Sequence, residues 1–193
     1  MHFRMQVDVL DCLGCGNCAD ICPGFKGNKA LSMVPLEGQL AEADNWNYCV
    51  ANVSEKPETT ANLNVIGSQY KKPLLEFSGS CAGCAETAYA RLITQLFGDR
   101  MYISNATGCS SIWGGPAATS PYTVDANGHG PAWANSLFED NAEHGIGMML
   151  GQKAVRNSLI AKVEGIVAKE GADAALVEAA KEYLATKDNG NAN

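Results

Sequence analysis

Four closely spaced cysteines near the start of the chain constrain its fold more than any other feature. The run Cys12-Leu-Gly-Cys15-Gly-Asn-Cys18-Ala-Asp-Ile-Cys22-Pro23 has the spacing C-x2-C-x2-C-x3-C-P. Thiolates at this spacing can wrap one face of a compact iron–sulfur centre, and the proline turns the chain away after the last cysteine. A structural zinc site more often uses paired C-x2-C knuckles separated by a longer loop. The spacing therefore predicts that these cysteines are ligands of iron–sulfur clusters.

A second group of cysteines is less specific in its spacing. Cys81-Ala-Gly-Cys84 is another C-x2-C pair, and Cys109 follows it further along the chain. By spacing alone the group could bind zinc, form a redox pair or have no common role. The surroundings favour a cluster, because glycine lets the backbone approach a bulky cofactor and leaves N–H groups free to bind its sulfides. These glycines are Gly79, Gly83 and Gly108.

Composition and charge exclude several classes of protein. The 193 residues are 46% hydrophobic and 18% charged, which is typical of a globular chain. The net charge of −7 argues against nucleic acid and anionic membrane as partners. The first residues show no signal peptide and clustered cysteines suit metal better than disulfides, so we expect reduced thiols and a cytoplasmic location. No apolar stretch approaches the length of a membrane span. Cys49 stands apart from both groups and is predicted to be a buried free thiol.

The hydrophobic pattern predicts a cysteine-bearing segment and then a connector. Alternation over residues 3–9 predicts a strand, Asn17–Cys22 a short helix, and Ala30–Val34 a second strand. Residues 36–73 are polar, contain two prolines and show no sustained period, which favours a connector.

Beyond the connector the pattern alternates between strand and helix. Met101–Ser104 reads as a strand, followed by a strand-to-helix turn at Gly108–Gly115 and a loop over 114–131. The capping box Ser136-x-x-Glu139 predicts the start of a helix running towards Leu150. Three further helices are predicted at Glu86–Phe97, Val155–Ala168 and Ala174–Thr186. This alternation is typical of a parallel sheet covered by helices.

Several motifs together resemble one known family. They are Cys12–Pro23, Leu74-Leu-Glu-Phe-Ser-Gly-Ser-Cys81-Ala-Gly-Cys84-Ala-Glu86, Asn105-Ala-Thr-Gly-Cys109-Ser-Ser-Ile-Trp113 and Gly130-Pro-Ala-Trp133. Over roughly residues 1–170 the chain resembles pyruvate:ferredoxin (flavodoxin) oxidoreductase. Members of that family are several times longer, so the resemblance implies an internal fragment that is truncated at both ends.

The resemblance implies a ligand role for seven cysteines. Cys12, Cys15 and Cys18 would bind one [4Fe–4S] cluster of a ferredoxin-type domain, and Cys22 would reach its neighbour. Cys81, Cys84 and Cys109 would bind a proximal cluster whose fourth ligand lies outside the chain. Glu86 and Cys109 match positions that contact thiamine diphosphate, whose Mg²⁺ is bound by residues outside this fragment.

The implied fold is α+β or α/β. Residues 1–35 would be half of a bacterial-type ferredoxin module, 36–73 a connector and 74–187 the first part of a thiamine-diphosphate-binding parallel-sheet domain, with a disordered tail at 188–193. The implied activity is oxidative decarboxylation of pyruvate, or another 2-oxo acid, to acyl-coenzyme A, with ferredoxin or flavodoxin as electron acceptor and a homodimeric parent enzyme. The fragment would be inactive alone.

Two alternatives remain open from the residues themselves. A stand-alone ferredoxin-like electron carrier would contain every cluster ligand within the chain. A zinc-binding structural module would contain zinc without iron or acid-labile sulfide.

Overall fold

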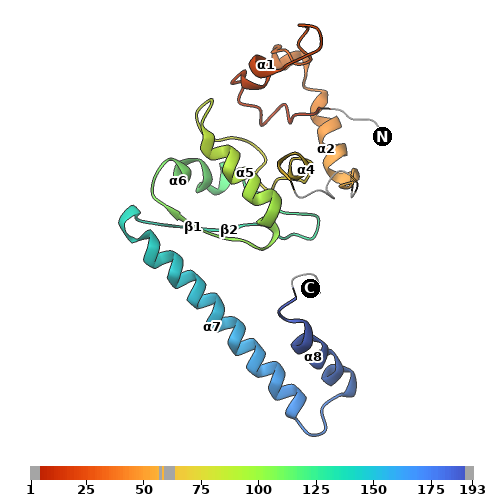
Figure 1. Cartoon of the computed structure of the whole chain (residues 1–193), viewed down its shortest axis with the longest axis vertical. Coiled ribbons are helices and arrows are strands. Elements are labelled where there is room, and N and C mark those ends of the chain that lie inside the picture. The colour runs from red at the N-terminus through yellow and green to blue at the C-terminus, as the bar shows by residue number, and fades with distance from the viewer. Residues whose placement is uncertain (1–4, 57, 59–63, 190–193) are drawn as a thin grey trace. The chain divides into compact units, whose positions relative to one another are not determined.

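The computed structural model describes residues 5–56, 58 and 64–189, and the chain divides into two compact units, Met1–Phe138 and Glu139–Asn193 (Figure 1). The boundary between the units lies inside the region 74–187 that was expected to belong to one domain. Helices and a small sheet occur together, which agrees with an α+β chain. The division into a ferredoxin-type segment, a connector and a thiamine-binding region stays a prediction.

The first unit contains short helices around one small sheet. Its helices are α1 (Asn17–Ile21), α2 (Glu42–Asn52), α4 (Val65–Ser68), α5 (Ala85–Phe97) and α6 (Cys109–Gly114), and its strands are β1 (Tyr102–Ala106) and β2 (Ala132–Ser136). Single 3-10 turns lie at Leu36–Gly38, Gly98–Arg100, Ala117–Thr119 and Phe138–Asp140. The predicted helices at α1 and α5 and the turn into α6 are confirmed.

The sheet is a parallel pair with a crossover through α6. Tyr102 pairs with Ala132 at one end and Ala106 with Ser136 at the other, and α6 packs against β1. The predicted strand Met101–Ser104 is confirmed with a small shift. Its partner β2 was missed, and the prediction that Ser136 caps a helix is wrong, because Ser136 is the last residue of β2.

The segment that follows the connector forms the core of the first unit. Leu74 and Leu75 are 4% and 2% exposed, and Leu75 forms an antiparallel bridge with Tyr122. The Glu76 N–H donates to the Pro121 carbonyl at 2.8 Å. Trp113 of α6 is also buried. This core holds the start of α5 close to α6, and so it places the residues around Cys81 and Cys109 in one unit.

Helix α5 buries two polar side chains near its carboxyl end. Thr94 and Gln95 are 3% and 5% exposed. The Gln95 side-chain amide donates to the Lys71 carbonyl at 2.9 Å, and the Thr94 hydroxyl donates to the Arg91 carbonyl at 2.8 Å. These bonds satisfy the buried polar groups, which would otherwise cost free energy.

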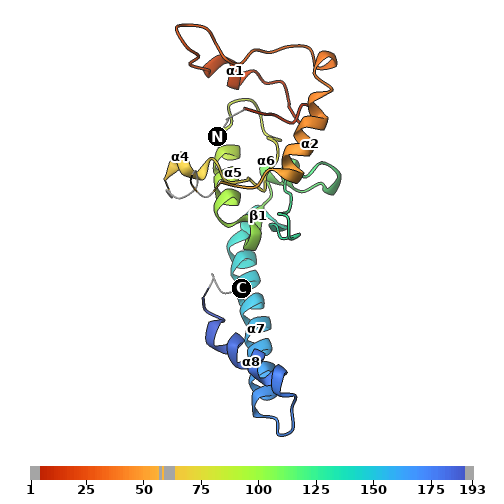
Figure 2. The same cartoon turned by 90° about the vertical axis from the view of Figure 1, so that its right-hand side faces the viewer.

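The second unit is a helical hairpin. After helix α7 (Asn141–Ala168) the chain turns at Gly171, whose φ of 75° is left-handed. Helix α8 (Ala174–Thr186) then runs back along α7 (Figures 1 and 2). The Asp173 carboxylate accepts a hydrogen bond from the Leu176 N–H at 3.0 Å and caps α8. The predicted α8 is confirmed. The two helices expected around Leu150 and Val155 form one helix, which starts after Asp140 rather than Ser136.

Two predicted strands are wrong. Residues 5–9 and Ala30–Val34 have no strand conformation, and residues 3 and 4 of the first strand lie outside the described residues. Several of their apolar side chains stay exposed: Met5, Val7 and Met33 are 64%, 52% and 50% exposed. Alternation marks a surface that could be half-buried, but a strand also needs hydrogen bonds from a neighbouring strand.

The connector contains more structure than its polar sequence suggested. Helix α2 occupies Glu42–Asn52, and α4 follows at Val65–Ser68. Cys49 lies in α2 and is half-buried, so the prediction of a buried thiol is wrong. None of the helices in the described ranges combines the length and apolarity needed to cross a bilayer.

Candidate functional site

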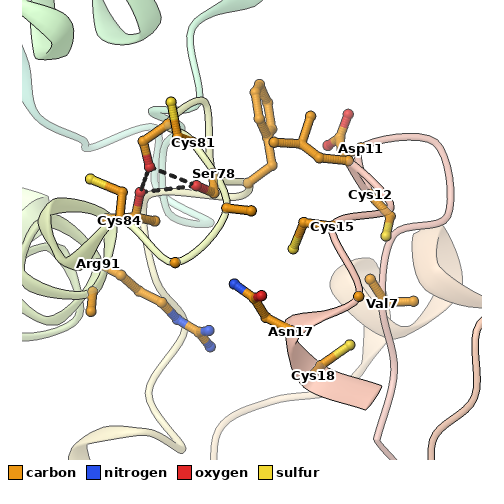
Figure 3. Close-up of a pocket in the computed structure, with 18 of the residues that line it drawn as sticks. Val7, Asp11, Cys12, Cys15, Asn17, Cys18, Ser78, Cys81, Cys84 and Arg91 are labelled. Atoms are coloured by element: carbon orange, nitrogen blue, oxygen red, sulfur yellow. Dashed lines mark hydrogen bonds between the residues drawn. The ribbon is translucent and has the colours of Figure 1, made fainter. Parts of the chain in front are cut away.

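One pocket in the first unit is lined by cysteines from both groups. Its volume is about 770 Å³. Figure 3 shows Cys12, Cys15 and Cys18 on one wall and Cys81 and Cys84 on the other. The structure therefore brings together five of the seven predicted ligands, although the two groups are about seventy residues apart in sequence.

Left-handed glycines shape the turns that carry these thiols. Gly14 and Gly16 have φ of 67° and 81°, and Gly83 has φ of 76°. A side chain at such a position is strained, so glycine is the residue that allows these turns. A Cβ at Gly14 would meet no atom within 4 Å. The backbone conformation, rather than lack of space, thus requires glycine there.

Hydroxyl groups form a compact cluster beside Cys81 and Cys84. The Ser78 hydroxyl lies 3.0 Å from that of Ser80 and 2.9 Å from that of Thr87, and Ser80 and Thr87 also contact each other. All three line the pocket, and Figure 3 shows their hydrogen bonds. This cluster joins the cysteine turn to the first turn of α5.

Cys22 lies outside the pocket lining and directly follows α1. Its sulfur accepts a hydrogen bond from the Ala30 N–H at 3.3 Å. The N–H groups of Ala30, Leu31 and Gly24, together with the charge of Lys29, hold the pKa of the Cys22 thiol below its ordinary value. A lowered pKa favours the thiolate, which is the form that binds metal.

Cys109 also lies outside the pocket lining, as the first residue of α6. It follows β1 at the carboxyl end of the parallel pair. A polar network occupies this end: the Asn105 amide donates to Asn135 Oδ1 at 2.9 Å, and the Asn135 amide donates to the Thr107 hydroxyl at 3.1 Å. Ligands of parallel sheets usually bind at the carboxyl ends of the strands, so Cys109 stands where a ligand could reach it.

Glu86 lies in the first turn of α5 and is exposed. Burial is the main cause that raises the pKa of Tyr122, and the negative charge of Glu86 raises it further. The Tyr122 ring lies 6.2 Å from that of Trp113 in α6. Glu86 therefore acts electrostatically on the same α5–α6 region that carries Cys109, which is where the resemblance expects thiamine diphosphate.

The donor chemistry fits iron–sulfur clusters. All eight cysteines are unpaired, and six of the seven predicted ligands are exposed, the exception being the half-buried Cys22. Thiolates are the ligands that such clusters use, and zinc accepts them too. Across residues 5–56, 58 and 64–189, no three His, Cys, Asp or Glu side chains converge closely enough to hold one metal ion. The five thiol-bearing residues of the pocket thus line it from two walls and do not surround a single point, and in Figure 3 the sulfurs of Cys81 and Cys84 point away from the wall that carries Cys12, Cys15 and Cys18.

The sequence reasoning missed several residues of the pocket. Asn17 and Arg91 extend into it, and the hydroxyls of Ser78, Ser80 and Thr87 line it. Asn17 could have been noticed, because it stands between two predicted ligands. Arg91 carries no such signal, since it lies in an ordinary helix away from any motif.

Comparison with known proteins identifies relatives for nearly the whole chain. It is 54% identical over 189 residues to a pyruvate-flavodoxin oxidoreductase of Klebsiella pneumoniae and 54% identical over 193 residues to a pyruvate:ferredoxin oxidoreductase of Moorella thermoacetica. Each match covers 98% of this chain. A pyruvate dehydrogenase [NADP(+)] of Euglena gracilis is 46% identical over 177 residues, which is 89% of this chain and 10% of that protein.

The chain is much shorter than these proteins. It spans about 16% of the length of the first two relatives. No protein-family model matches it. The identity nevertheless extends from one end of the chain almost to the other, through both cysteine groups. This chain is therefore homologous to one segment of the pyruvate:ferredoxin and pyruvate-flavodoxin oxidoreductases, and the resemblance inferred from its motifs is confirmed.

Proposed function

We propose that this chain is a segment of an enzyme that oxidatively decarboxylates pyruvate, or another 2-oxo acid, and supplies ligands for its iron–sulfur clusters. In the whole reaction the 2-oxo acid and coenzyme A give acyl-coenzyme A and carbon dioxide, and the electrons leave singly for ferredoxin or flavodoxin. The names of the relatives support pyruvate as substrate and flavodoxin or ferredoxin as acceptor. The parent enzyme is proposed to be a cytoplasmic homodimer.

The pocket shared by the two cysteine turns is the observation that carries this proposal. Electron transfer between clusters needs them close together, and a chain that places two cluster-type turns on facing walls provides that proximity. Cys12, Cys15 and Cys18 would hold a cluster on one wall. Cys81 and Cys84, with Cys109, would hold a second, and Cys22 would serve a third cluster of the ferredoxin-type domain.

The protein contributes spacing, shielding and charge. Left-handed glycines free backbone N–H groups beside the thiols, and such N–H groups are among the factors that set cluster potentials. Glu86 and Cys109 would contact thiamine diphosphate, which supplies an electron sink for decarboxylation when it is bound. The Mg²⁺ of that cofactor would be bound by residues of the parent enzyme outside this segment. The α5–α6 region would then orient the cofactor near the cluster on the second wall.

Anaerobic purification of the full-length protein that carries this segment tests the proposal. We expect iron and acid-labile sulfide in similar amounts and a loss of both in Cys15→Ser and Cys84→Ser. Cys49→Ser is the matched control, because Cys49 lies in α2 and not in the pocket lining, and it should keep its full content. Zinc without sulfide would instead identify a structural zinc module. Two complete clusters in the isolated 193-residue chain would identify a ferredoxin-like carrier.

A further inference from the structure

The two cysteine turns approach each other at Asn17 and Gly83. Asn17 stands between Cys15 and Cys18, and Gly83 stands between Cys81 and Cys84. A Cβ built on Gly83 would lie 4.0 Å from the Asn17 side-chain nitrogen. The amide of one turn thus lies within van der Waals reach of a side chain built on the other turn.

The charges around the pocket are unevenly distributed. Among its described lining residues Arg91 is the single basic side chain, whereas Asp8, Asp11 and Glu76 are acidic. Asp8 and Asp11 lie on the wall that carries Cys12, so acidic side chains already gather beside those thiols.

Arg91 is placed to compensate for this charge from the opposite wall. Its side chain extends from α5 into the pocket, and Figure 3 shows it directed towards the side on which Asn17 lies. In the described part of the chain no carboxylate forms an ion pair with Arg91, while Arg100, in the 3-10 turn that follows α5, pairs with Asp99 at 2.7 Å. The charge of Arg91 is thus not neutralised by a neighbouring side chain.

We propose that Arg91 is a positioning residue that stabilises the reduced state of the cluster held by Cys12, Cys15 and Cys18. This inference rests on the proposed function. A thiolate-bound [4Fe–4S] cluster has a net negative charge that increases when it accepts an electron, and net charge is one of the factors that set its potential. A cation across the pocket favours the more negative state. It therefore raises the potential of the cluster that receives electrons.

Redox titration of the full-length protein, followed by electron paramagnetic resonance, tests the role of Arg91. In Arg91→Gln we expect the midpoint potential of one cluster to shift to more negative values, with iron and sulfide content unchanged. Arg91→Lys retains the charge and should keep the potential near that of the wild type. Arg100→Gln removes an arginine that does not line the pocket and is the control for a general change of charge.

The outcomes separate the two proposals. If the wild-type protein contains no iron–sulfur cluster, the proposed function fails. If it contains clusters and Arg91→Gln has the same potentials as Arg100→Gln, the inference about Arg91 is wrong while the proposed function stands. Equal shifts in Arg91→Gln and Arg91→Lys would also overturn it, because they would indicate an effect of shape instead of charge.

Discussion

Replacement of Gly79 by alanine should destabilise the first unit. A Cβ at Gly79 would lie 2.5 Å from the Cβ and 3.2 Å from the Cγ of Trp113. Neither atom is the flexible end of a side chain, and Trp113 is buried in the core with 9% exposure. The backbone of residue 79 or the helix α6 must therefore move to admit the extra carbon.

Overpacking of this kind costs about 1–3 kcal/mol of unfolding free energy. A loss of 1–2 kcal/mol alone lowers the ratio of folded to unfolded protein roughly 5- to 30-fold. With a urea dependence of about 1–3 kcal/mol per molar for a small protein, the midpoint of unfolding should fall by on the order of 1 M. Tryptophan fluorescence in a urea titration would measure this shift, with the iron content of all samples matched because bound clusters stabilise the fold.

Gly38→Ala is the control for the same chemical change in open space. A Cβ at Gly38 would meet no atom within 4 Å, so we expect an unchanged midpoint or a stabilisation of about 0.4–1 kcal/mol from the stiffer unfolded chain. The reasoning would be refuted if Gly79→Ala unfolded at the same urea concentration as Gly38→Ala, because the contact with Trp113 would then carry no steric cost.

Three further predictions concern single substitutions. Asp173→Ala should cost about 0.5–2 kcal/mol by removing the cap of α8, and Asp173→Asn should retain most of it; circular dichroism during thermal unfolding distinguishes them. Gly147→Ala should stabilise α7 by about 0.5–1 kcal/mol, since a Cβ there meets no atom within 4 Å, and a lower melting temperature would contradict this. Glu86→Gln should lower the pKa of Tyr122 by removing a negative charge, as measured by the alkaline absorbance titration of tyrosine. The pKa of Tyr122 is higher in the folded protein than in the unfolded chain. The stability that the protonated Tyr122 contributes is therefore complete below the unfolded pKa, about 10, and is lost as the pH rises above it. Glu86→Gln should reduce this alkaline loss.

Local signals predicted α1, α5 and α8 but missed α2 and α4 in the connector. The apolar period locates α8, and the alanine- and leucine-rich run locates α5. These elements close their hydrogen bonds within themselves, so residues close in sequence decide them. Helix α7 was predicted as two helices, one running towards Leu150 and one at Val155–Ala168, yet no residue between them blocks the helical hydrogen bonds.

The strands depend on partners that sequence does not reveal. Strand β2 has only five residues, four of them small or polar and one a tryptophan, and its hydrogen bonds come from β1, thirty residues earlier in register. Residues 5–9 have a better alternating pattern and no strand conformation. A pairing partner, more than local pattern, thus decides which extended segments become strands.

The candidate site also has one part that local sequence predicts and another that depends on contacts between distant segments. Cysteine spacing singled out the two groups of thiols, five of which line the pocket. It did not identify Arg91 or the Ser78 hydroxyl cluster, whose importance arises from the meeting of two segments in the pocket. Nor did it indicate that Cys22 and Cys109 lie outside the lining of that pocket.

The parallel pair β1–β2 has a practical consequence for work with the chain. Within the described residues each strand is paired on one side only, so the outer rows of N–H and C=O groups can template the addition of an extended peptide. Parallel sheets are normally wide and covered on both faces. Concentrated preparations of the isolated chain should therefore self-associate through these edges, and dilute samples carrying a solubilising fusion are the better starting material.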